Sequence, residues 1–162
     1  GVQAIGSDGV DKRVDVASAF LSKQGTVYDL AAFEHCYAPP FSSAKDPLNM
    51  AGFIAENVIK GRVKQASARH VIEKAGDYTI IDVREKIETG FGMIPGAINI
   101  PLNTLRYHIK ELPKDKKILI YCAVGLRGYI AARQLMNRGI TEVYNLSGGF
   151  TTYNMLKGMD SH

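Results

Sequence analysis

Residues 118–132 of the chain read Ile-Leu-Ile-Tyr-Cys-Ala-Val-Gly-Leu-Arg-Gly-Tyr-Ile-Ala-Ala, and this stretch decides the fold. The apolar run 118–121 follows a charged segment and is rich in residues that favour extended structure, which predicts a buried strand. From Arg127 onward, apolar residues recur at helical spacing, which predicts a helix to about residue 138. Cys122 therefore lies where a strand passes through a short loop into a helix.

That position favours a reactive cysteine. The first N–H groups of a helix lack internal partners and carry a partial positive charge, so a loop around a helix start forms a nest for anions. A thiolate is stabilised in such a nest. Arg127 adds a positive charge, while Gly125 and Gly128 allow close approach of the backbone. A cysteine after a strand is often only a small buried hydrophobe, but this combination of features favours a nucleophile.

The spacing within the loop narrows the chemistry. Cys122 and Arg127 form a Cys-x4-Arg motif, whereas cysteine-dependent phosphatases use Cys-x5-Arg and would need arginine where Gly128 stands. The shorter nest suits a persulfide sulfur better than a phosphate. The loop resembles the active-site loop of the rhodanese (sulfurtransferase) family. The resemblance implies two catalytic residues, Cys122 and Arg127, and a substrate-binding set of Ala123, Val124, Gly125, Leu126 and Gly128.

Further motifs extend the resemblance over residues 66–158. These are Asp-Val-Arg-Glu at 82–85, Ile-Pro-Gly-Ala at 94–97 and Leu-Ser-Gly-Gly at 146–149. Strands near 78–82, 97–100, 118–121 and 142–145 alternate with helices, which predicts an α/β fold, rhodanese-like, with a parallel sheet covered by helices on both faces. The motifs fall at the carboxyl ends of the strands, where such sheets bind ligands. Asp82, Arg84, Gly148 and Gly149 are expected to support the site structurally.

The first 61 residues predict a mostly helical segment, with helices near 10–23, 27–33 and 47–60 and the end of a strand at 2–6. Residues 9–13 (Gly-Val-Asp-Lys-Arg) and 37–47 (Tyr-Ala-Pro-Pro-Phe-Ser-Ser-Ala-Lys-Asp-Pro) resemble the end of the dimerisation domain of flavin-dependent pyridine nucleotide-disulfide oxidoreductases, in the coenzyme A-disulfide reductase branch. Residues 62–65 are expected to be a linker. The resemblance implies that Tyr37 contributes to a reductase site; packing at a dimer interface is the equal alternative.

Composition excludes several classes of function. The chain has 162 residues, 46% of them hydrophobic, and a formal charge of +4 from scattered Lys and Arg, which argues against nucleic-acid binding. No run approaches the about 20 apolar residues of a membrane helix. Two cysteines give no disulfide framework, so a reducing cytoplasm is expected. No metal-binding spacing is present, and no Gly-x-Gly-x-x-Gly follows a strand.

The residues and the resemblances together predict rhodanese-type sulfur transfer through a Cys122 persulfide. Small-molecule persulfides or thiols are the expected substrates, and no cofactor is expected to bind this chain. The resemblance further implies that the chain is a C-terminal fragment of a homodimeric coenzyme A-disulfide, persulfide or polysulfide reductase that uses FAD, NADH and coenzyme A. A non-catalytic rhodanese-like binding module and a cysteine-dependent phosphatase are the alternatives.

Overall fold

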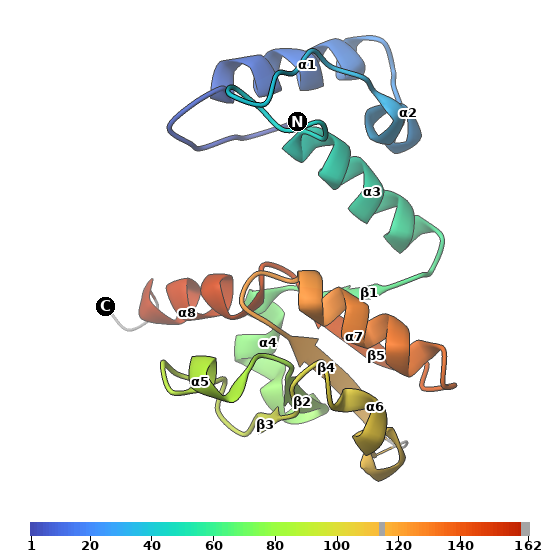
Figure 1. Cartoon of the computed structure of the whole chain (residues 1–162), viewed down its shortest axis with the longest axis vertical. Helices are drawn as coiled ribbons and strands as arrows, with labels where there is room; N and C mark the ends of the chain where they lie inside the picture. The colour runs from blue at the N-terminus through green and yellow to red at the C-terminus, as the bar shows by residue number, and fades with distance from the viewer. Residues whose placement is uncertain (114–115, 160–162) are drawn as a thin grey trace. The chain divides into compact units, whose positions relative to one another are not determined.

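The computed structural model describes residues 1–113 and 116–159, and the chain divides into two compact units (Figure 1). The first unit comprises Gly1–Gly61 and the second begins at Arg62. Each unit has its own set of packed elements and is described separately below.

The first unit contains three helices, α1 (Val10–Ser22), α2 (Val27–Ala32) and α3 (Pro47–Ile59). Thr26 caps α2 by accepting a hydrogen bond from the backbone of Asp29, and Asp46 caps α3 in the same manner through Leu48. The three predicted helices are thus present. Residues 2–6, expected to be the end of a strand whose partners are absent, have no regular structure in this chain.

Helices α2 and α3 pack closely against each other. A Cβ atom at Gly52 would lie 2.6 Å from the backbone nitrogen of Ala31, so only glycine permits this approach. The fully buried Asn49 donates hydrogen bonds to the carbonyl oxygens of Leu30 and Phe33, 3.1 and 2.8 Å away. It thereby satisfies carbonyl groups at the end of α2 that have no partner within the helix.

The second unit is built on a five-stranded sheet in the order β1-β5-β4-β2-β3, in which all neighbouring strands pair parallel (Figure 1). The central position of β4 places its residues in the middle of the core. The predicted α/β fold with a parallel sheet is confirmed. The strands are β1 (Lys64–Ala66), β2 (Tyr78–Asp82), β3 (Ile98–Asn99), β4 (Lys117–Tyr121) and β5 (Val143–Leu146).

Helices cover both faces of this sheet, as predicted. Ile118 and Ile120 of β4 share one core with α6 and α7, while Leu119 and Tyr121 point to the opposite core with α4 and α8. Alternate residues of one strand therefore anchor two layers of helices. The helices are α4 (Ala68–Lys74), α5 (Lys86–Thr89), α6 (Leu105–His108), α7 (Leu126–Met136) and α8 (Gly149–Met159), with short 3₁₀ turns at Ala75–Asp77 and Ile109–Glu111.

Three sequence-based expectations differ from the structure. The expected linker at residues 62–65 extends into β1, whose backbone pairs with β5 at the edge of the sheet. The polar stretch 85–92, expected to be a loop, contains the short helix α5. The helix expected from Pro101 begins only at Leu105, and residues 102–104 form a turn in which the carbonyl oxygen of Pro101 accepts hydrogen bonds from the N–H groups of Thr104 and Leu105.

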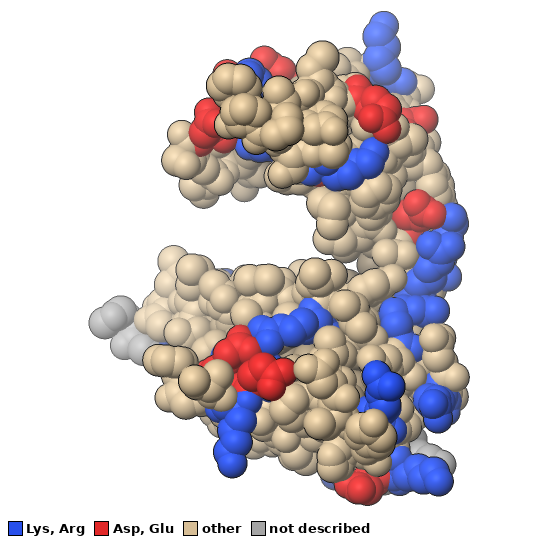
Figure 2. Space-filling view, in the orientation of Figure 1, with Lys and Arg blue, Asp and Glu red and all other residues tan. Residues whose placement is uncertain are grey.

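The surfaces of both units carry charges of both signs. Figure 2 shows basic and acidic side chains interspersed with broad uncharged areas on the visible face of each unit. Within the described residues, no helix combines the length and the apolar character that crossing a membrane requires.

Candidate active site

The cysteine loop comprises residues 122–125, which connect β4 to α7, and the first two residues of α7, Leu126 and Arg127, and it holds Cys122 in a buried position. Cys122 is 1% exposed and packs in the core on the α7 side of the sheet. The backbone N–H of Gly125 donates a hydrogen bond to the Cys122 sulfur at 3.1 Å. Gly125 has φ +120°, a conformation that side chains disfavour, so a glycine is required to turn this N–H toward the sulfur.

The Gly148-Gly149 turn at the start of α8 lies directly against the cysteine loop. A Cβ atom at Gly149 would be 2.5 Å from the carbonyl oxygens of both Cys122 and Ala123, so only glycine fits. The backbone N–H groups of Phe150 and Thr151 donate to these same carbonyl oxygens, at 2.8 and 3.1 Å. The turn therefore fixes the carbonyl side of the loop.

A buried asparagine holds the other end of the loop. Asn145 lies in β5, is 4% exposed, and donates from Nδ2 to the carbonyl oxygen of Gly125 at 3.2 Å. A Cβ atom at Gly128 would lie 2.3 Å from Asn145 Oδ1, which explains the glycine in the first turn of α7. Sequence reasoning missed Asn145. Its signal was a polar side chain near the carboxyl end of a buried strand.

Arg127 forms a bidentate ion pair with Glu88 of α5. Arg127 Nη1 and Nη2 donate to Glu88 Oε2 and Oε1 at 2.6 and 2.7 Å, and both side chains are about one-third exposed. The hydrogen bonds from Arg127 lower the pKa of Glu88 from 4.5 to about 2, and Glu88 in turn raises the pKa of Arg127. Sequence reasoning missed Glu88. Its spacing of three residues from Glu85 fits a capping box, the pattern in which two side chains cap the start of a helix, and could have indicated a helix there.

The lowered pKa of Glu88 predicts a pH-dependent contribution to stability. Because the folded pKa is below the unfolded value, the ion pair stabilises the fold above about pH 4.5 and loses this effect as the pH falls toward 2. The free energy of unfolding of the parent chain should exceed that of Glu88→Gln by less than about 1 kcal/mol at neutral pH, since the pair is partly exposed. Urea titrations across this pH range measure the difference. A difference that stays constant down to acid pH would contradict the assignment, and the exposed Glu73→Gln provides the matched change in charge for comparison.

Asp82 and Arg84 form a second, fully buried ion pair at the end of β2. Arg84 donates from Nε and Nη2 to the Asp82 carboxylate at 2.7–3.1 Å, and Arg84 Nη2 also donates to the carbonyl oxygen of Gly92 at 2.7 Å. The guanidinium lies over the ring of Phe150, 4.4 Å from its centre, and 5.6 Å from that of Tyr121. Burial is the main cause of the raised pKa of Tyr121, and the neighbouring Asp82 carboxylate raises this pKa further. The pair thus ties β2 to the segment after α5 and to the start of α8.

The side chains that flank the loop are apolar and exposed. Val124 and Leu126 are 67% and 65% exposed within the loop, and Ile87 and Phe91, on either side of Glu88, are 79% and 86% exposed. We call these four residues the apolar rim. They come from the two segments that the Glu88–Arg127 pair joins, so the exposed side chains that flank this pair are uncharged.

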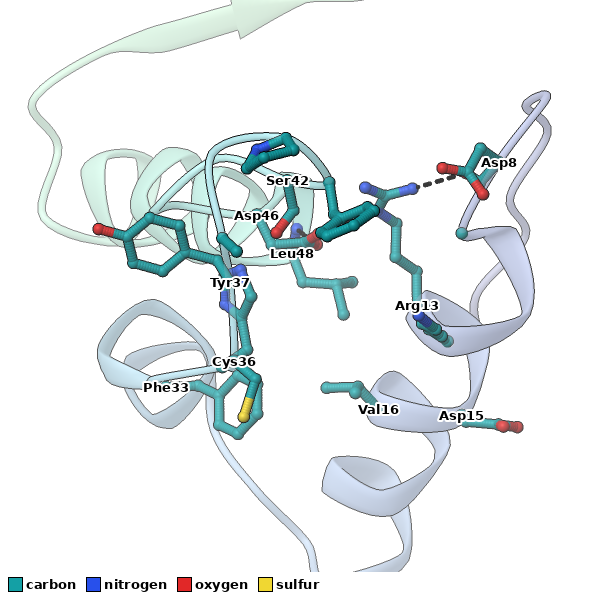
Figure 3. Close-up of a pocket in the computed structure, with 16 residues that line it drawn as sticks. Asp8, Arg13, Asp15, Val16, Phe33, Cys36, Tyr37, Ser42, Asp46 and Leu48 are labelled. Carbon is teal, nitrogen blue, oxygen red and sulfur yellow. Dashed lines mark hydrogen bonds and ion pairs between the residues drawn. The ribbon is translucent and has the colours of Figure 1, made fainter.

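Tyr37 belongs to the first unit, whereas all other predicted site residues belong to the second. It borders a cavity of about 880 Å³, is 54% exposed, and its hydroxyl points away from the neighbouring lining residues (Figure 3). Cys36, beside it, is an exposed free thiol. The ring nitrogens of His35 are buried and have no hydrogen-bond partner among the described residues. The cavity is lined by Asp8, Gly9, Lys12, Arg13, Asp15, Val16, Phe33, His35, Cys36, Tyr37, Ala38, Pro40, Phe41, Ser42, Asp46 and Leu48.

Comparison with protein families matches residues 65–156 to the rhodanese-like domain. A sulfurtransferase of Allochromatium vinosum is 38% identical over 77 residues, which are 48% of this chain and 72% of the relative. A coenzyme A disulfide reductase of Staphylococcus aureus is 51% identical over 53 residues, which are 33% of this chain and 12% of the relative.

Two solved structures match most of the chain, covering residues of both units. The reduced form of Bacillus anthracis CoADR-RHD matches 94% of the chain with 46% identity and a TM-score of 0.88. An NAD-dependent persulfide reductase from A. fulgidus matches 91% of the chain with 34% identity and a TM-score of 0.78. The chain spans only 27% and 26% of these two proteins, about a quarter of each.

Proposed function

Since the chain belongs to the rhodanese-like domain family, we propose that it transfers sulfane sulfur through a persulfide on Cys122. The observation that carries this proposal is the position of the Cys122 sulfur, buried at the end of β4 with the Gly125 N–H 3.1 Å away. The Gly125 N–H and the start of α7 lie next to this sulfur, where they can interact with negative charge that develops on it during transfer.

The proposed reaction has two displacements. The Cys122 thiolate attacks the outer sulfur of a donor persulfide, the donor S–S bond breaks, and the donor leaves as a thiolate. Cys122 then carries the sulfur as a persulfide within the loop formed by Ala123, Val124, Gly125, Leu126 and Gly128. An acceptor thiolate attacks that outer sulfur and releases the Cys122 thiolate. No net oxidation or reduction occurs, and the number of sulfur atoms balances in each step.

The apolar rim supports a sulfur atom carried on a thiol as the donor. Val124 and Leu126 offer no hydrogen-bond donors from their exposed side chains, whereas a small dianion such as thiosulfate would require several charge-assisted contacts to replace its hydration. We therefore propose small-molecule persulfides and thiols as substrates.

Similarity to the reductases supports a wider proposal for a longer protein of which this chain is a part. In it, the sulfur transfer serves a flavin-dependent reductase acting on coenzyme A disulfide, persulfide or polysulfide. FAD, NADH and coenzyme A would be held by that longer protein, which we propose to be a cytoplasmic homodimer. Tyr37, exposed at the edge of the first-unit cavity (Figure 3), is proposed to hydrogen-bond a leaving thiolate in the reductase site.

Sulfur uptake tests the proposed function. After incubation with polysulfide or coenzyme A persulfide, the intact chain should gain the mass of one sulfur atom, and peptide mapping should place it on Cys122. The variant Cys36→Ser removes the exposed second thiol and should still take up one sulfur atom. If no donor labels Cys122 in either protein, the domain is better explained as a binding module without transfer chemistry.

A further inference from the structure

We propose that Glu88 determines which donors the Cys122 site accepts, by cancelling the positive charge of Arg127 and so disfavouring donors with negative charge beside the transferred sulfur. This inference deepens the proposed sulfur transfer and rests on it. Glu88 does not contact the reacting sulfur in the structure; it acts through Arg127, as a positioning residue that sets specificity.

The geometry of the ion pair supports neutralisation of Arg127. Two guanidinium nitrogens of Arg127 each donate to a separate oxygen of Glu88, at 2.6 and 2.7 Å. This paired arrangement is the strongest that arginine makes with a carboxylate. The Glu88 carboxylate is the main cause of the raised pKa of Arg127. The charge that an isolated Arg127 would present to an anion beside Cys122 is therefore largely compensated.

The position of Glu88 is fixed by contacts on both sides of α5. Glu88 Oε2 accepts a hydrogen bond from the backbone N–H of Glu85 at 3.1 Å, at the start of the helix. After the helix, the carbonyl oxygen of Gly92 accepts from Arg84, which the buried Asp82 holds in place. The carboxylate is thus oriented toward Arg127 before any donor arrives, and an incoming anion would have to displace it.

Among the described residues, the side chains around the Glu88–Arg127 pair do not supply another positive charge close to Cys122. All four residues of the apolar rim are uncharged. The cation adjacent in sequence, Lys86, is exposed at the first position of α5, where water and salt screen its charge. In Glu88→Gln, the glutamine can keep a hydrogen bond to Arg127, but the arginine charge becomes uncompensated.

Alkylation of Cys122 tests the electrostatic role directly. Iodoacetate and iodoacetamide have nearly the same size and both displace iodide to form an S–C bond, but only iodoacetate is anionic. In a Cys36→Ser background, Glu88→Gln should raise the ratio of the iodoacetate rate to the iodoacetamide rate by about fivefold. This is the order of magnitude expected when the charge of Arg127 loses its counter-charge and attracts a nearby anion. The increase should shrink at high salt.

Matched variants separate charge from structure. Glu73→Gln makes the same change in charge at an exposed position of α4 and should leave the ratio unchanged. Glu88→Asp keeps the negative charge and should stay close to the parent. Arg127→Gln leaves Glu88 uncompensated and should lower the ratio, which provides a test even if Glu88→Gln does not fold. An unchanged ratio in both Glu88→Gln and Arg127→Gln would overturn the proposal.

Sulfur uptake then connects the charge effect to the donor. Glu88→Gln should increase labelling of Cys122 by thiosulfate, a dianion, relative to labelling by benzenethiosulfonate, a monoanion that gives up its outer sulfur and leaves as the sulfinate, also by about fivefold. If the parent chain takes up sulfur from both donors and the variant keeps the same preference, Glu88 does not set specificity, although sulfur transfer stands. If no protein takes up sulfur from any donor, the proposed function fails, and the alkylation ratios alone decide the role of Glu88.

Discussion

Replacing Cys122 with serine should reduce sulfur transfer to thiol acceptors by about 1,000-fold or more, as loss of a covalent nucleophile does in other enzymes. A serine hydroxyl has nearly the same size as the thiol, but it remains protonated at neutral pH and cannot carry a persulfide. The Gly125 N–H would still face the substituted oxygen, so the loop itself should be retained. Steady-state transfer from polysulfide to a thiol measures the effect.

The control for this variant is Cys36→Ser, which changes the exposed thiol of the first unit and should transfer sulfur at the parental rate. Thermal unfolding should show that Cys122→Ser still folds, with a cost of about 1–3 kcal/mol for a hydroxyl in a buried site. Transfer by folded Cys122→Ser at the parental rate would mean that another group accepts the sulfur, and the proposed mechanism would have to be abandoned.

Asp82→Asn should lower the free energy of unfolding of the second unit by about 3–5 kcal/mol, because it leaves the buried Arg84 without its counter-charge. Asp82 is 0% exposed and Arg84 is 4% exposed, so water cannot replace the lost partner. Asparagine preserves the size of the side chain, and the effect therefore reports the charge rather than a cavity. Urea unfolding followed by circular dichroism provides the measurement.

Asp77→Asn is a suitable comparison for this prediction. Asp77 is exposed immediately before β2, and its substitution should change the free energy of unfolding by no more than about 0.5 kcal/mol. If Asp82→Asn were equally mild, Arg84 would have to find other partners after the substitution. In that case the buried pair would not be the main support of the segment that carries Glu88.

The sequence was most informative where apolar runs were long and continuous. The run from Ile118 to Tyr121 predicted β4 to within one residue, and the helix after Arg127 followed from its spacing. The edge strand β1 was not predictable in this manner, because it has three residues and begins with Lys64 and Gln65. Such a strand forms because β5 supplies its backbone partners, which no local pattern records.

The path of the backbone around Cys122 could be predicted from the sequence, but the ion pairing of the charged side chains beside it could not. The Gly148-Gly149 turn, expected from its motif to support the site, packs against the cysteine loop through Gly149. The roles of Cys122 and Arg127 in catalysis remain predictions. Arg127 was expected to add a positive charge beside Cys122, and sequence reasoning did not foresee its ion pair with Glu88, 39 residues earlier in the chain. Pairing at that separation depends on how α5 lies against the loop, and composition and spacing do not encode it.

The hydrogen bonds from Phe150 and Thr151 to the carbonyl oxygens of Cys122 and Ala123 have a kinetic meaning. In the proposed transfer, peptide dipoles held by the fold need not rotate when the Cys122 thiolate becomes a persulfide and back again, so the reorganisation energy of each step should stay low. Under that proposal, the start of α8 keeps the cysteine loop rigid around the transferred sulfur. A substitution that loosens it should slow turnover before it produces any measurable unfolding.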